Sequence, residues 1–170
     1  GTIGGVERLA RTDRRHAATT EEWDADIWLL NTPGGVLDLR NGQARPHERL
    51  QRMTKITTAT ARGTSPRWLA FIDQITQGDA QYVAYLQRFA GYCLTGSTQE
   101  HALFFLYDTG ANGKSVFVNT LFTILGDYAA HAPMDTFMET RGDRHPTDLA
   151  GLRGARFVGA TETEQGRRWN

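Results

Sequence analysis

Apolar positions recur at helical spacing in the middle of the chain and predict two consecutive helices. The first is expected to follow Ser65 as its cap, with Pro66 at its first position, and to end at Gly78. The second is expected to follow Asp79 as its cap and to end at Gly96. The apolar stripes consist of Trp68, Leu69, Phe71, Ile72 and Ile75 in the first helix and of Tyr82, Val83, Leu86, Phe89, Ala90 and Cys93 in the second. We expect the two helices to pack on each other.

Short apolar runs nearer the amino terminus predict a small strand-containing module. Residues 26–30 and 36–40 are β-like runs, and Asn41 with Gly42 is a strong turn signal because both residues tolerate positive φ. The threonine-rich segment 50–61 is expected to be another strand. A hairpin or meander is therefore predicted in this part of the chain.

The same module contains aromatic and basic side chains of the kinds that bind nucleic acid. Trp23 and Trp28 are candidate platforms for base stacking. Aromatic residues in a short strand-containing module are more often part of the hydrophobic core, so we expect both tryptophans to be core residues. A helix is expected over residues 5–15. The densest basic cluster lies there and consists of Arg8, Arg11, Arg14 and Arg15. Acidic residues follow it closely, so we expect a solvated helix end.

The most informative stretch is residues 108–115, which read DTGANGKS. An apolar run expected to be a strand, residues 101–107, precedes it, and a helix-like apolar run, residues 116–125, follows it. Glycines let the backbone turn its N–H groups toward an anion, and the N-terminus of the new helix adds the positive end of its dipole. Strand, glycine-rich loop and helix in this order predict a phosphate-binding loop (P-loop) with a nucleotide as ligand.

Each residue of such a loop has an expected role. Lys114, one of only two lysines among 19 basic residues, reaches the β- and γ-phosphates, and Ser115 supplies a hydroxyl to Mg²⁺. The backbone N–H groups expected to hold phosphate oxygens belong to Gly110, Ala111, Asn112 and Gly113. Asp108 departs from the usual pattern, which has glycine there. Its carboxylate weakens phosphate binding unless it points away or is screened.

A P-loop also needs a carboxylate that holds Mg²⁺ and orients the attacking water, usually at the end of a neighbouring strand. Residues 156–164 form a short β-compatible run that ends in two acidic residues. Parallel strands deliver their C-terminal ends to one edge of a sheet, where the nucleotide lies. We therefore predict that Glu162 binds the metal together with Ser115 and that Glu164 polarises the water. The alternative is that both are solvated acids in a turn.

Composition narrows the classes of protein. The chain has 170 residues and a formal net charge of zero, so its surface as a whole does not attract nucleic acid electrostatically. Any contact with DNA is therefore expected to be local. No apolar run approaches the roughly 20 residues that a membrane span requires, and the first residues have no signal-peptide pattern. Cys93 is the only cysteine, which excludes a disulfide framework and a zinc cluster, and we expect it in the core.

Four stretches resemble the replicative primase-helicases of phages, plasmids and integrated elements, in which a superfamily 3 helicase follows an upstream region also seen in poxvirus primase-helicases. They are residues 29–42, 85–96, 104–115 and 152–164, and the Asn-Gly-Lys-Ser form of the loop is typical of that family. The resemblance implies an ATP-driven homo-hexamer that encircles DNA and moves along one strand. It also implies ATP and Mg²⁺ as cofactors, and the cytoplasm of a bacterial host cell as location.

The expected fold class is α/β. A strand-containing module (1–62) and a helical pair (63–98), which corresponds to the family's collar, lead into a truncated P-loop core of the AAA+-like kind (99–170). The family's sensor strand, arginine finger and DNA-tracking hairpin are expected further along, so we expect weak ATP hydrolysis or none from these residues alone. Two alternatives stay open: another P-loop NTPase or kinase, and a non-catalytic interaction module in which Asp108 marks a decayed loop.

Overall fold

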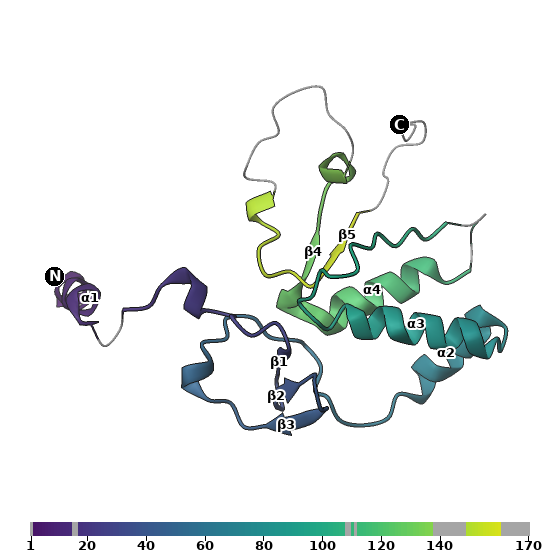
Figure 1. The fold of residues 1–170 in the computed structure, drawn as a ribbon, viewed down its shortest axis with the longest axis horizontal. Helices are drawn as coiled ribbons and strands as arrows, with labels where there is room; N and C mark the ends of the chain where they lie inside the picture. Colours follow the sequence, from purple (N-terminus) through teal and green to yellow (C-terminus); the bar gives the residue numbers. More distant parts are fainter. Residues whose placement is uncertain (1, 15–16, 108–109, 111, 138–148, 161–170) are drawn as a thin grey trace.

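A computed structural model describes residues 2–14, 17–107, 110, 112–137 and 149–160. Figure 1 shows a body of helices and short strands, from which the amino-terminal helix stands apart. The helices are α1 (Thr2–Thr12), α2 (Pro66–Thr76), α3 (Ala80–Tyr92) and α4 (Lys114–Leu125). The strands are β1 (Leu29–Thr32), β2 (Gly35–Asp38), β3 (Gln43–Arg45), β4 (Ala129–His131) and β5 (Phe157–Gly159). Short 3₁₀ turns are η2 (Thr20–Glu22), η3 (Arg49–Gln51), η4 (Gly126–Tyr128) and η5 (Met134–Phe137).

The strands β1, β2 and β3 form an antiparallel meander, as the β-like runs predicted. The turn between β2 and β3 contains Asn41 and Gly42, and the φ of Gly42 is 72°, in the region that favours glycine. β1 begins at Leu29, later than predicted, because the carboxylate of Asp26 accepts the N–H of Trp28 at 3.0 Å and holds a turn there. The predicted meander is confirmed, with a shifted first boundary.

The prediction of a strand over residues 50–61 is wrong. After η3 this segment is irregular, and its N–H groups bind to different elements. The N–H of Thr57 donates to the carbonyl of Asn31 in β1, and the N–H of Thr58 donates to the carbonyl of Ile124 in α4, both at 3.0 Å. A strand needs successive bonds to a single neighbour, so the segment links the meander to α4 instead.

Both helices predicted for the middle of the chain exist and lie against each other (Figure 1), but α3 ends at Tyr92, ahead of the predicted end at Gly96. α2 begins at Pro66 directly after Ser65, but the Ser65 side chain forms no capping hydrogen bond, and the helix ends before Gly78, whose φ is 75°. The carboxylate of Asp79 caps α3 by accepting two N–H groups of its first turn, at 2.8 and 3.2 Å. Leu69, which we expected in the apolar stripe, lies instead on the exposed side of α2.

The helix predicted after the loop is confirmed as α4, and it packs on a parallel pair of strands, β4 and β5 (Figure 1). β5 lies within the run predicted over residues 156–164, whereas β4 was not predicted. The ring centre of Phe122 in α4 lies 4.8 Å from that of Phe157 and 3.8 Å from that of His131. A Cβ on Gly159 would lie 2.7 Å from the Phe122 ring. The missing side chain therefore lets the helix approach the sheet closely.

One hydrophobic core joins the meander, the helices α2 to α4 and the β4–β5 pair. Its buried residues are Leu30, Ile72, Leu86, Phe89, Cys93, Phe117, Leu121, Leu125, Tyr128 and Phe157. The ring of Phe89 lies 5.9 Å from that of Phe117 and 6.3 Å from that of Phe157. Cys93 is buried as predicted, and burial raises the pKa of its thiol to about 11. Elements that are distant in sequence are thus held together by burying their apolar side chains in one shared core.

A half-buried arginine adds polar bonds across this core. The guanidinium of Arg156 donates to the carbonyl oxygens of Leu94 and Leu29, each at 2.6 Å, and lies 4.4 Å from the ring centre of Tyr128. Burial lowers the pKa of Arg156. The hydroxyl of Tyr128 accepts the N–H of Asn31 at 3.2 Å. These bonds connect β1, the end of α3 and the start of β5.

The prediction of a strand over residues 101–107 is wrong as well. Phe104 packs edge-on against Phe89 with ring centres 4.3 Å apart, but Leu103 and Tyr107 are 71% and 81% exposed. A strand exists only through ladder bonds to a neighbour, and none of the described strands pairs with this segment. The segment nevertheless runs beside α4 toward the N-terminus of that helix (Figure 1).

The described residues form a mixed α/β fold with a small antiparallel sheet and four helices. In the part of the chain that the structure describes, no helix is long and apolar enough to cross a membrane. The fold brings the predicted loop to the start of α4, next to α2.

Candidate nucleotide-binding loop

The turn into α4 is determined by one glycine. Gly113 is the N-cap residue, with φ 86° and ψ 0°, and Lys114 is the first residue of the helix. A Cβ at Gly113 would lie 2.6 Å from Cγ2 of Ile75 and 3.0 Å from the ring of Phe71, both in α2. Backbone conformation and packing therefore both require glycine at this position. The helical pair thus positions the start of α4.

The side chain of Lys114 is half-buried and held by its own loop. Its ammonium Nζ donates to the amide Oδ1 of Asn112 at 2.8 Å. Gly110, on the other side of the turn, has φ 121° and open space where a Cβ would lie. The lysine is therefore held by a side chain of its own loop, and its role toward phosphate stays a prediction.

The N-terminus of α4 presents hydrogen-bond donors. The N–H of Phe117 makes the first helical bond, to the carbonyl of Gly113 at 2.9 Å. The N–H groups of residues 114–116 precede it and have no carbonyl of the helix to bind, as in the first turn of any α-helix. Ser115 is exposed in this turn. Donors and the positive dipole end together favour an anion at this point.

Four residues of the predicted site lie outside the described part of the chain. They are Asp108, Ala111, Glu162 and Glu164. β5 ends at Gly159, ahead of the two glutamates. The roles assigned to these residues therefore stay predictions, as does the magnesium site formed by Ser115 and Glu162.

Sequence reasoning missed three contributions to the loop. It assigned only a backbone role to Asn112, whereas the structure shows its side chain accepting from Lys114. It placed Phe71 and Ile75 in an apolar stripe but did not predict that they lie against Gly113. The asparagine was visible in the motif, but the contact between α2 and α4 joins segments that are distant in sequence and gives no local signal.

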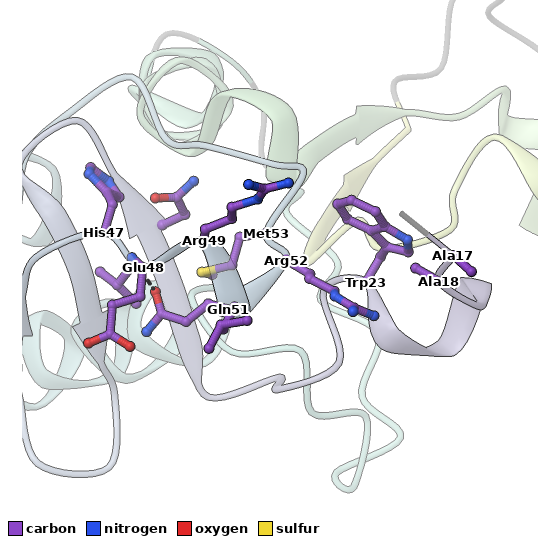
Figure 2. A pocket seen from close by; sticks show the side chains of 12 residues that line it. Ala17, Ala18, Trp23, His47, Glu48, Arg49, Gln51, Arg52 and Met53 are labelled. Atoms are coloured by element: carbon purple, nitrogen blue, oxygen red, sulfur yellow. Dashed lines mark hydrogen bonds between the residues drawn. The ribbon is translucent and has the colours of Figure 1, made fainter. Parts of the chain in front are cut away.

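Sequence reasoning also missed a cleft in the upstream part of the chain. It has a volume of about 910 Å³ and is lined by parts of residues 17–23, 31–36 and 47–53. Figure 2 shows Trp23 and Arg49 among the side chains that line it. The core prediction is wrong for Trp23, which is 46% exposed, whereas Trp28 is half-buried.

A comparison with known families matches the amino-terminal part of the chain. The family described as D5 N terminal like matches residues 1–77, which include α1, the meander and α2. This match supports a D5-type primase-helicase upstream domain and agrees with that part of the resemblance. It does not extend to the loop at the start of α4. No curated protein matches the chain.

Proposed function

We propose that the chain combines the upstream domain of a primase-helicase with the ATP-binding part of a superfamily 3 DNA helicase. The family match supports the first half, because D5-type domains are associated with primase-helicase proteins. The turn formed by Gly113 and Lys114 supports the second half and is the observation on which we chiefly rely. Few other ligands need a left-handed glycine, a lysine and a helix N-terminus at one point.

The proposed chemistry follows from the side chains of the loop. Lys114 neutralises the β- and γ-phosphates of ATP, and the loop N–H groups bind phosphate oxygens. Ser115 and Glu162 would hold Mg²⁺, which would supply positive charge against the phosphates, and Glu164 would polarise the attacking water. The parallel pair β4–β5 supports this arrangement, since strands next to a P-loop bring their acidic ends to the nucleotide edge of the sheet.

The bond between Lys114 and Asn112 prepares the lysine for phosphate. An ammonium bonds more strongly to a charged phosphate oxygen than to a neutral amide oxygen, so ATP displaces Asn112 as acceptor. Until then the amide keeps the long side chain near the loop and lowers the rotamer entropy that binding removes. Asn112 thus contributes to affinity without a direct role in hydrolysis.

Isothermal titration calorimetry with ATP and Mg²⁺ tests the proposed site. Lys114→Ala removes a charge-assisted bond of about 1.5–3 kcal/mol, so we expect affinity to fall by about 10- to 150-fold. Lys114→Arg keeps the charge but brings a wide planar group, and we expect it to bind poorly as well. Asn119→Ala is the matched control, because Asn119 is exposed on the same helix. It should bind as the unchanged chain does.

Asp108→Gly distinguishes a loop that binds ATP weakly because of Asp108 from a loop that no longer binds ATP. It removes a negative charge from a position where the usual pattern has glycine, so we expect tighter ATP binding. If neither the unchanged chain nor Asp108→Gly releases or absorbs heat with Mg-ATP, the proposed site is rejected.

For the full-length protein we propose a homo-hexamer that encircles DNA and moves along it as ATP is hydrolysed. This extends the resemblance and the upstream match to the whole assembly. Native mass measurement with ATP and single-stranded DNA should detect hexamers. Monomers under all conditions would contradict the ring and leave the nucleotide site unaffected.

A further inference from the structure

The cleft in the upstream part of the chain lies away from the P-loop. Figure 1 shows η3, whose residues line the cleft, at the opposite end of the body from the N-terminus of α4. The cleft needs its own explanation, because neither Mg-ATP binding nor the packing of the core uses it. Its walls combine an aromatic ring, a histidine, arginines, amide groups and the carboxylate of Glu48.

The residues on either side of Trp23 are held in place, while its indole stays open. The N–H of Asp24 donates to the carbonyl of Arg52 at 3.0 Å, and the carboxylate of Asp24 accepts the N–H of Thr54 at 2.8 Å. On the other side of the tryptophan, Glu22 forms an ion pair with Arg52. No ring in the described part of the chain packs against the indole of Trp23. The platform is thus positioned before a ligand arrives, which lowers the entropy cost of binding.

Arg49 is the cation that the cleft leaves available. Arg52 is paired with Glu22, whereas the side chain of Arg49 has no ion pair or hydrogen bond with any residue that the structure describes. Figure 2 shows the Arg49 guanidinium and the Trp23 indole extending toward the same part of the cleft. An exposed guanidinium near an open aromatic face suits a phosphate next to a stacked base.

Two further polar atoms lie in the wall. Asn31 Oδ1 and Gln51 Nε2 are buried without a hydrogen-bond partner among the described residues. Buried polar atoms normally have a partner. Oδ1 of Asn31 lacks a donor and Nε2 of Gln51 lacks an acceptor, and the edge of a base carries both kinds of group.

We propose that this cleft binds a nucleotide unit of single-stranded DNA, with its base stacked on Trp23 and its phosphate against Arg49. A single open indole needs an unstacked base, which a single strand offers and a duplex does not. A free mononucleotide has the same chemistry, so the test compares the two sources. The inference does not depend on the proposed Mg-ATP site, because the cleft shares no residue with residues 110–115.

Fluorescence anisotropy of a labelled oligothymidylate, measured with the whole chain at several salt concentrations, tests the proposal. Trp23→Ala should lower the affinity by about 5- to 150-fold, whereas Trp23→Phe should keep most of it, since a phenyl ring still stacks. Arg49→Gln should reduce the slope of log K against log salt by about 0.7, the value for one phosphate contact on a single strand. Arg67→Gln is the matched control, because Arg67 is exposed on α2 outside the cleft, and it should leave the slope unchanged.

Two further arms distinguish the source of the nucleotide and the site. In the first arm, thymidine monophosphate competes with the labelled oligonucleotide for the cleft. If it displaces the oligonucleotide at similar concentrations, the cleft is a site for free nucleotides and the proposal of a DNA strand is wrong. If it displaces the oligonucleotide only weakly, the cleft is a site for a DNA strand, as proposed. All variants are repeated with Lys114→Ala, which should not change the effect of Trp23→Ala. Equal binding by Trp23→Ala, Arg49→Gln and Arg67→Gln overturns the proposal, and far-UV circular dichroism confirms that each variant is folded.

Discussion

Arg156 offers the sharpest test of how the fold is held together. Its guanidinium donates to carbonyl oxygens of Leu29 and Leu94, which belong to β1 and to the segment after α3, and it lies over the ring of Tyr128. Replacing it with alanine removes all three interactions together. We therefore expect Arg156→Ala to destabilise the whole described core rather than only the region around β5.

The expected magnitude follows from these contacts. Two hydrogen bonds from a charged donor contribute about 1.5–3 kcal/mol each, and the contact with the Tyr128 ring adds about 1–2 kcal/mol. Against this, truncation relieves the desolvation of a half-buried cation, which costs a few kcal/mol and which also lowers the pKa of Arg156. We expect a net loss of about 2–4 kcal/mol for Arg156→Ala. Arg156→Lys should lose about 1–2 kcal/mol, because one ammonium does not bond to both carbonyls as the planar guanidinium does.

Urea unfolding followed by circular dichroism measures these losses as shifts of the midpoint at constant slope. Arg153→Ala is the control, because Arg153 is exposed close by in the chain and its removal should change stability by less than about 0.5 kcal/mol. The reasoning fails if Arg156→Ala unfolds within about 0.5 kcal/mol of the unchanged chain, or if Arg156→Lys is fully stable.

Two further predictions concern the loop and the meander. Gly113→Ala should lower the free energy of unfolding by about 2–4 kcal/mol, because the backbone there is left-handed and the new Cβ would lie 2.6 Å from Ile75. In the same urea experiment the control Gly91→Ala, which places its Cβ in open space on α3, should leave the stability unchanged or raise it slightly. The hydrogen bond from Arg40 lowers the pKa of the Asp26 carboxyl, so its stabilisation is present above the unfolded pKa of about 4 and is lost as pH falls through the lower folded pKa. Asp26→Asn should therefore be less stable than the unchanged chain near neutral pH and equally stable in strong acid; a constant difference at all pH values would contradict this.

Local signals predicted the helices well. Pro66 and Asp79 mark the first turns of α2 and α3, and the glycine and lysine before the apolar run mark the start of α4. A helix makes its backbone bonds within one segment, so caps and periodicity are enough to place it. The turn at Gly42 was predictable for the same reason, because its conformation depends on the residue itself.

Pairing between distant segments was not predictable in this way. β4 exists because residues 129–131 lie beside β5, and residues 101–107 are not a strand because no described strand pairs with them. The Thr-rich segment divides its bonds between β1 and α4, and Trp23 stays exposed because Asp24 holds its backbone on residues 52–54. In each case the outcome depends on a partner far along the chain.

The sequence by itself therefore determined the helices and the meander turn, and it carries the prediction of a phosphate-binding loop. The tertiary structure alone decided that Ile75 and Phe71 require a glycine before Lys114, that Arg156 joins three elements, and that a cleft opens beside Trp23. The physical reason is the range of the interactions: capping and backbone preferences act within a few residues, whereas close packing and strand pairing act between surfaces that only the folded chain brings together.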